Sequence, residues 1–222
     1  MNLALWAAAA TGVQVGAAIV ASRFAVAEVP PLTLALLRYT IGFACLAPFA
    51  VRFLGSFRAD PGVERPPGAM HSGVRDIAVM AALGIGQFAV LIALLNFGLQ
   101  RVGAARAALI FSLLPLLTMA LAAALGRERV TVGLGAGVLL SIAGVALSLA
   151  PKLGTSQPGE WIGELAVLAS AGVGALCSVL YRPYLRRYPT LPVSALAMGA
   201  SVLFLALLAL SEAWPARVAG LS

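Results

Sequence analysis

Long apolar runs, separated by short polar connections, dominate the chain. Seven of these runs contain about 18 or more residues each. An α-helix rises about 1.5 Å per residue and the hydrocarbon core of a bilayer is about 30 Å thick, so each run is long enough to cross it as a helix. The predicted spans are Leu3–Ala25, Leu32–Leu54, Ile77–Leu99, Val102–Leu125, Val132–Leu149, Ile162–Tyr181 and Leu191–Leu210.

The composition agrees with this pattern. Hydrophobic residues make up 61% of the 222 residues and charged residues only 10%, whereas a soluble domain carries about 25% charged residues. The first apolar run lacks a preceding basic segment and is too long for a signal peptide, so we interpret it as a retained helix. We therefore predict an all-α, multi-pass membrane protein that is surrounded by the lipid bilayer.

The charge distribution predicts an orientation in the membrane. The net charge is +7, and fourteen of the fifteen basic residues are arginines, mostly at the ends of apolar runs. Basic residues favour cytoplasmic loops, and a cytoplasmic N-terminus in the cell (inner) membrane places nine of them on inner connections against three on outer ones. The outer three are Arg101, Lys152 and Arg217. The basic residues are not interleaved with exposed aromatic residues, so we predict no nucleic-acid partner.

Small residues line one face of the predicted helix over residues 132–149. They recur at nearly helical spacing: Gly133, Gly137, Ser141, Gly144 and Ser148. A face of this kind allows close approach of another helix. It predicts packing within the chain or between two copies, so a homodimer is one expected arrangement.

Residues 95–151, which read "LNFGLQRVGAARAALIFSLLPLLTMALAAALGRERVTVGLGAGVLLSIAGVALSLAP", carry an ordered set of motifs. A small-residue start to the fourth helix precedes Pro115 in "SLLPLL", where a kink is expected. The turn "LGRER" and a Gly-rich fifth helix follow. Together with "PPLTLALLRYTIGFACLAP" in the second helix, which includes Arg38, this order resembles the EamA-type repeat of the drug/metabolite transporter superfamily. Arg127 is an insertion relative to the usual turn.

The resemblance implies two inverted repeats of five helices. An odd number of spans forces a second copy to enter the membrane in the opposite orientation. We assign residues 3–151 to the first repeat and residues 158–222 to the start of a second, truncated repeat with two helices. The implied function is a carrier or exporter of small metabolites, such as amino acids, that works by alternating access. The alternative is a non-transporting membrane scaffold, or a half-unit that needs a partner chain.

Five polar side chains are candidate contacts for the substrate. Arg38 lies about six residues into the second span and Arg106 about four residues into the fourth. Two guanidinium groups would favour a carboxylate or phosphate, hence an anionic or zwitterionic substrate; alternatively, each reaches the outer headgroups. The intramembrane amides Gln14, Gln87 and Asn96 complete the set, with hydrogen bonding between helices as their other role. Gln87 and Asn96 lie half a turn apart, which predicts that they serve different surfaces.

The remaining chemistry excludes several classes of protein. The single histidine, His71, lies in the polar connection, and the sequence has no HExxH, GxSxG or P-loop pattern, so we predict neither an enzyme nor an ATPase. Cys45 and Cys177 have no metal-ligand spacing, so no metal or cofactor is expected. The sole lysine, Lys152, lies outside the spans, which excludes a retinal-type Schiff base.

Overall fold

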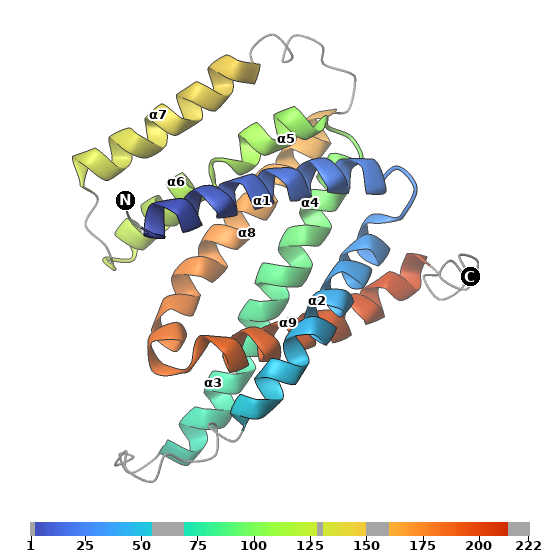
Figure 1. Cartoon of the computed structure of the whole chain (residues 1–222), viewed down its shortest axis with the longest axis vertical. Helices are drawn as coiled ribbons and strands as arrows, with labels where there is room; N and C mark the ends of the chain where they lie inside the picture. The colour runs from blue at the N-terminus through green and yellow to red at the C-terminus, as the bar shows by residue number, and fades with distance from the viewer. Residues whose placement is uncertain (1–2, 55–68, 128–130, 150–159, 213–222) are drawn as a thin grey trace. The chain divides into compact units, whose positions relative to one another are not determined.

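The computed structural model describes residues 3–54, 69–127, 131–149 and 160–212, and no β-strand occurs in these ranges (Figure 1). The helices follow one another as α1 (Leu3–Ala25), α2 (Pro31–Leu54), α3 (Ala69–Gly84), the π-helix η2 (Ile85–Val90), α4 (Leu91–Leu99), α5 (Ala104–Phe111), α6 (Leu114–Ala124), α7 (Val132–Leu149), α8 (Glu160–Arg187), α9 (Thr190–Ala209) and the 3₁₀ turn η4 (Leu210–Glu212). The predicted all-α class is confirmed.

A helix or a run of helices occupies each of the seven predicted spans. Five stretches of the described residues are long and apolar enough to cross a membrane: Pro31–Phe49, Val74–Leu99, Ala104–Ala124, Glu160–Arg187 and Thr190–Glu212. The helices at the first and fifth predicted spans, α1 and α7, form over the predicted residues. They lie outside these five stretches, and the apolar part of α7, Gly135–Gly144, is shorter.

The chain divides into two compact units. Unit 1 contains the described residues of Met1–Pro31 and Ala93–Gly172, and unit 2 contains those of Leu32–Ile92 and Val173–Ser222. The units do not coincide with the two predicted repeats, because each unit draws helices from both halves of the sequence. The boundaries of the repeats therefore stay a prediction.

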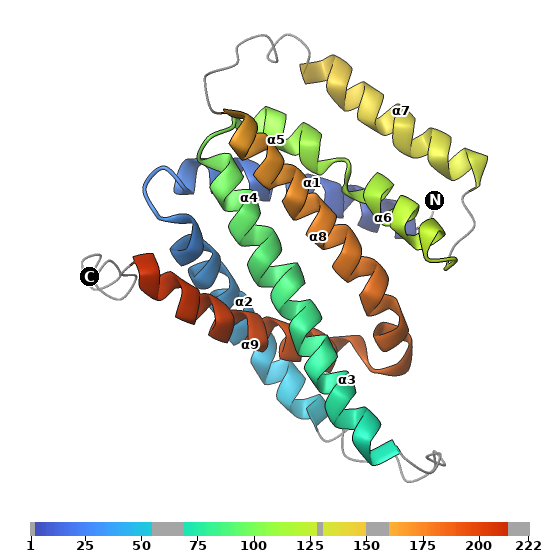
Figure 2. The ribbon, with the colours of Figure 1, turned by 180° about the vertical axis from the view of Figure 1, so that it is seen from behind.

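Unit 2 is built around α9, which packs along α3 and η2 (Figures 1 and 2). One cluster of its buried core contains Met80, Tyr181, Val193 and Ala197. The hydroxyl of Tyr181 donates a hydrogen bond of 2.6 Å to the backbone carbonyl of Met80. This bond satisfies the one polar atom that Tyr181 brings into the core, so its ring is held in a fixed position between α3 and α8.

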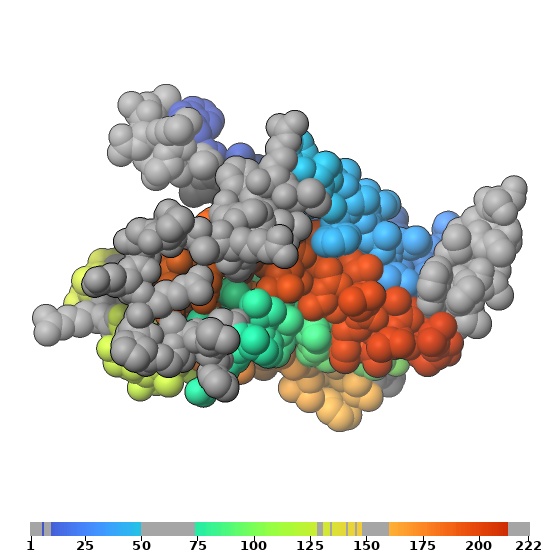
Figure 3. Space-filling model, turned by 90° about the horizontal axis from the view of Figure 1, so that it is seen from below, coloured from blue at the N-terminus to red at the C-terminus, as the bar shows by residue number. Residues whose placement is uncertain are grey.

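Single glycines allow the helices of unit 2 to approach closely. A Cβ placed on Gly84 would lie 2.5 Å from the Cα of Ala197, and a Cβ placed on Gly86 would lie 2.6 Å from the Sγ of Cys177. A Cβ on Gly199 would lie 3.1 Å from the ring of Phe43, where α2 and α9 meet (Figure 3). These separations leave no room for a side chain at Gly84 or Gly86.

A carboxylate from the end of unit 2 caps the start of α2. Glu212 accepts hydrogen bonds from the backbone N–H groups of Leu32 at 3.2 Å and Thr33 at 2.8 Å, and from the hydroxyl of Thr33 at 2.9 Å. The first N–H groups of a helix have no partner within it, and a negative charge is favourable at this end of the helix dipole. Glu212 therefore joins α9 to α2 although about 180 residues separate them.

Replacing Glu212 with alanine should destabilise unit 2 by about 1–2 kcal/mol, because the cap of α2 and its charge are lost together. The free energy of unfolding in a mixed detergent titration measures this change. Glu28→Ala is the control, since Glu28 is exposed in the turn before α2. Equal effects of the two substitutions would contradict a capping role for Glu212.

The fourth predicted span is broken where the sequence predicts a kink. Helix α5 ends at Phe111 and α6 begins at Leu114, with Pro115 in its first turn. Pro115 has no N–H to donate to the carbonyl four residues earlier. Helix α6 ends at Ala124, and Gly126, just beyond it, has a φ of 65° that permits a Schellman cap. In this cap the N–H groups of Gly126 and Arg127 donate to the carbonyls of Ala123 and Ala122, both at 2.9 Å.

Glycines also mediate close packing within unit 1. A Cβ on Gly98 of α4 would lie 2.5 Å from a methyl group of Val167 on α8, and one on Gly163 would lie 2.6 Å from a methyl group of Val102. The small-residue face of α7 behaves differently. Apart from the nearby backbone of α7 itself, no atom of the described residues lies within 4 Å of a Cβ placed on Gly133, Gly137 or Gly144. The side chains of Ser141 and Ser148 lie outside the described ones. Packing by this face therefore stays a prediction.

Candidate substrate cavity

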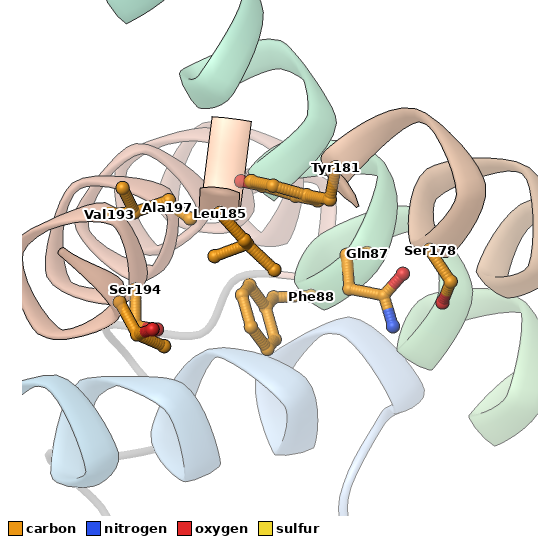
Figure 4. A pocket seen from close by; sticks show the side chains of 9 residues that line it. Gln87, Phe88, Ser178, Tyr181, Leu185, Val193, Ser194 and Ala197 are labelled. Carbon is orange, nitrogen blue, oxygen red and sulfur yellow. The ribbon is translucent and has the colours of Figure 1, made fainter. Parts of the chain in front are cut away.

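A cavity of about 270 Å³ lies within unit 2, between η2, the second half of α8 and the first half of α9. In the view of Figure 4, Phe88 projects into it, with Gln87 and Ser178 on one side and Ser194 on the other. The lining residues are Gln87, Phe88, Ser178, Tyr181, Leu185, Thr190, Val193, Ser194 and Ala197. None of these side chains is acidic or basic, so the cavity combines apolar walls with neutral hydrogen-bonding groups.

The π-helix η2 delivers two neighbouring side chains to this cavity. The N–H of Leu91 donates to the carbonyl of Gly86, five residues earlier rather than four. The wider turn changes the direction of the side chains, and π-turns inside α-helices are frequent at functional sites. Gln87 and Phe88 both line the cavity although they are consecutive in sequence.

Gln87 carries an unsatisfied polar atom. Its Oε1 is buried and, among the described residues, has no hydrogen-bond partner. The hydroxyl of Tyr181, by contrast, is already bonded to Met80. Buried acceptors are normally paired, so the amide oxygen of Gln87 can accept a hydrogen bond from a further donor.

Arg38 is not among the residues that line the cavity, but its neighbour in sequence, Tyr39, contacts one of them. Arg38 is exposed on α2. The next residue, Tyr39, stacks edge-on against Phe88 with ring centroids 5.5 Å apart. Arg38 is thus one residue from the side chain that supports a wall of the cavity, and its predicted contact with substrate stays a prediction.

Arg106 belongs to unit 1, where two carboxylates of α8 neutralise it. It forms an ion pair with Glu160 and a second one, at 3.3 Å, with Glu164. The side chains of Arg106 and Glu160 are only 12% and 18% exposed, while Glu164 is 39% exposed. The two acids lie one helical turn apart and meet the guanidinium from one face of α8. The structure thus gives Arg106 two carboxylate partners on α8, and its predicted contact with substrate stays a prediction.

The other predicted amides lie in unit 1. Asn96 is only 1% exposed, and its Nδ2 donates a 3.0 Å hydrogen bond to the carbonyl of Pro31, just after the turn that follows α1. Its Oδ1 has no partner within the described part of the chain. Gln14 is exposed on α1. Gln87 lines the cavity of unit 2, whereas Asn96 bonds to the backbone of Pro31 in unit 1.

A cluster of three polar side chains connects α3 to the end of α8. Asp76 accepts a 2.7 Å hydrogen bond from the hydroxyl of Tyr188 and a 3.4 Å bond from Arg187. Burial raises the pKa of the Tyr188 hydroxyl above its ordinary value, and its hydrogen bond to Asp76 raises that pKa further. The cluster connects the middle of α3 to the end of α8 and to the connection between α8 and α9.

The comparisons with known proteins agree with this architecture. Residues 2–150 match the EamA-like transporter family. The chain belongs to this family. A curated relative from Streptantibioticus cattleyicolor, described as a probable terminal-alkyne amino-acid exporter, is 30% identical over 207 residues, which are 92% of this chain and 63% of the relative. The chain thus spans less than two thirds of the length of that relative.

Among solved structures, the crystal structure of one protein shares the fold of this EamA-family chain. The TM-score is 0.58, the identity is 24%, and the match covers 90% of this chain and 67% of the other.

Most residues that line the cavity of this EamA-family chain were not predicted from the sequence. Only Gln87 was among the candidates; Ser178, Tyr181 and Ser194 were not. A signal for them exists, because Ser178, Tyr181 and Leu185 are spaced three and four residues apart and so share one face of a helix. The same spacing joins Thr190, Ser194 and Ala197. These two helix faces can be recognised as cavity walls only once the structure shows that η2 lies opposite them.

Proposed function

We propose that this chain is the substrate-binding part of a membrane carrier that exports small metabolites such as amino acids. The observation that carries the proposal is the match of residues 2–150 to the EamA-like transporter family. The description of a relative as an amino-acid exporter supports the substrate class. The neutral, partly apolar cavity of unit 2 has the size and character of a site for a small molecule.

The proposed mechanism is alternating access between inverted repeats. Carriers of this architecture hold substrate near the middle of the membrane, at segments where helices are interrupted. Two interruptions support this mechanism here: η2, which lines the cavity, and the break between α5 and α6 at Pro115. A helix with a locally irregular backbone changes shape at lower free-energy cost than a regular one, which suits segments that must move during transport.

The proposed orientation in the cell (inner) membrane places the N-terminus in the cytoplasm, on the basis of the arginine distribution. Reporter tags inserted at Gly68 and at Gly154 should then be found on opposite faces, with the tag at Gly68 in the cytoplasm. Both tags on the same face would contradict the orientation and the inverted-repeat arrangement.

Transport by reconstituted protein tests the proposed function. The purified chain would be placed in liposomes, alone and fused to the part of the exporter relative that this chain does not cover. Exchange of radiolabelled amino acids would be compared with empty liposomes. Saturable exchange by either form supports a carrier. Exchange by the fused form alone identifies this chain as a half-unit that requires further helices. No exchange by either form, with folding verified, would contradict the proposal.

A further inference from the structure

We propose that the cavity of unit 2 recognises its substrate by an amino group, and that the Oε1 of Gln87 is the acceptor that binds it. The expected ligand class is a small primary amine, charged as an ammonium ion, with an apolar body. This inference rests on the proposed function, since it names the substrate class of the same cavity.

The first step is the unsatisfied acceptor. The Oε1 of Gln87 is buried without a partner among the described residues, and the side chain of Gln87 is one of those that line the cavity. A buried acceptor without a donor is destabilising, so its presence at a cavity indicates that a donor arrives with the ligand. An amide oxygen accepts hydrogen bonds and cannot donate them. The ligand must therefore present an N–H or O–H group at this point.

The second step is the charge of the lining. None of the nine residues around the cavity is basic, so a carboxylate placed there would lose its water without gaining a cationic partner. An ammonium ion finds more favourable contacts in this lining. The amide oxygen accepts one of its three protons, and the aromatic faces of Phe88 and Tyr181 attract a cation within about 6 Å of a ring. The lining thus favours an amine over an acid.

The third step is the rigidity of the acceptor. The tight contact of Gly86 with Cys177 fixes the residue before Gln87 against α8, and the stacking of Tyr39 fixes the residue after it. The aliphatic side chains of Leu185, Val193 and Ala197 leave an apolar volume for the body of the ligand. A polar group held on a firm backbone at the border of an apolar cavity selects orientation as well as chemistry.

Three probes of one shape test the inference: leucine, 3-methylbutylamine, which lacks the carboxylate, and 4-methylpentanoate, which lacks the amino group. Equilibrium binding to the purified full chain in nanodiscs would be measured for each. We expect 3-methylbutylamine to bind most tightly and leucine more weakly, because leucine also brings a carboxylate. We expect 4-methylpentanoate to bind at least about tenfold more weakly than the amine, since hydrogen bonds to charged groups are worth about that factor or more.

Two variants locate the effect. Gln87→Leu should weaken binding of 3-methylbutylamine about tenfold or more, whereas Gln87→Glu, which keeps acceptor oxygens at this position, should retain it or strengthen it. Gln100→Leu is the matched control, because Gln100 is exposed at the end of α4 and outside the cavity. Loss of binding in Gln87→Glu would show that the amide acts as a donor and would overturn the inference.

The remaining outcomes separate this inference from the proposed function. If 4-methylpentanoate binds as tightly as the amine, or if Gln87→Leu binds the amine unchanged, recognition by an amino group at Gln87 is overturned while a carrier function stands. If none of the three probes binds to wild-type protein, the inference is also overturned. The exchange assay then decides independently whether the protein transports other amino acids.

Discussion

Replacing Gly84 with alanine should lower the free energy of unfolding by about 1–3 kcal/mol, the usual effect of overpacking a well-packed core. The added Cβ would lie 2.5 Å from the Cα of Ala197 and 2.6 Å from its Cβ. Because one of these atoms belongs to the backbone, no change of rotamer relieves the clash, and α9 must move away from α3. Reversible unfolding in mixed detergent micelles, followed by circular dichroism, measures the change.

Gly144→Ala is the matched control for this prediction. No atom lies within 4 Å of a Cβ at Gly144 in α7, so the same substitution meets open space. Alanine is favoured over glycine inside a helix by about 0.5–1 kcal/mol. The two substitutions should therefore change stability in opposite directions, with Gly84→Ala destabilising and Gly144→Ala neutral or stabilising.

A second substitution tests whether the contact with Ala197 is responsible. Ala197→Gly in the Gly84→Ala background removes the Cβ contact but leaves the Cα of residue 197 in place. Recovery should therefore be partial. Full stability in Gly84→Ala alone would mean that α3 and α9 do not approach as closely as the structure has them.

The glycines that mediate close helix packing are not identifiable from the sequence alone. The regular stripe on α7 predicts close packing within the chain or between two copies, and no other part of the described chain lies within 4 Å of a Cβ on its described glycines. The glycines that do allow close approach, among them Gly84, Gly98 and Gly163, form no stripe. Whether an isolated glycine mediates packing depends on which helix lies opposite, and that is a property of tertiary structure that one sequence does not encode locally.

The helices were easier to predict than their irregularities. Apolar runs of sufficient length predicted a helix in each of the seven spans, although α3 begins at Ala69, before the predicted start at Ile77. Pro115 predicted the break in the fourth span because proline removes a donor from the helix. The π-helix at residues 85–90 has no comparable signal. Helix α8 also continues to Arg187, beyond the predicted span and through Pro183, because an apolar pattern marks where a bilayer ends rather than where a helix does.

Some features of the candidate site were predictable from the sequence and others were not. Gln87 stands out in the sequence as a polar residue within an apolar run, and the structure places it at the cavity. The ion pairs of Arg106 could not be read from the sequence, because about 54 residues separate it from Glu160. Hydropathy identifies an unusual charge in a span; its partner depends on how the helices are arranged.

Replacing Arg106 with glutamine should destabilise the protein by about 3 kcal/mol, the low end for removing one partner of a buried pair, since Glu164 stays partly exposed. Glu160 and Glu164 would then face each other one turn apart on α8 without a cation between them. Arg106→Lys should be intermediate, because an ammonium group lacks the fork that reaches two carboxylates. Unfolding in mixed micelles measures all of these changes. Arg186→Gln, at the exposed far end of α8, is the control.

A compensating substitution separates the two roles of Arg106. In the triple variant Arg106→Gln, Glu160→Gln and Glu164→Gln, no charge remains in the cluster, so most of the lost stability should return. If Arg106 serves only to hold α5 against α8, exchange of amino acids should return with it. If Arg106 binds an anionic substrate, exchange should stay lost in the triple variant while stability recovers. Loss of exchange in Arg106→Gln without any loss of stability would contradict a structural role for the ion pairs.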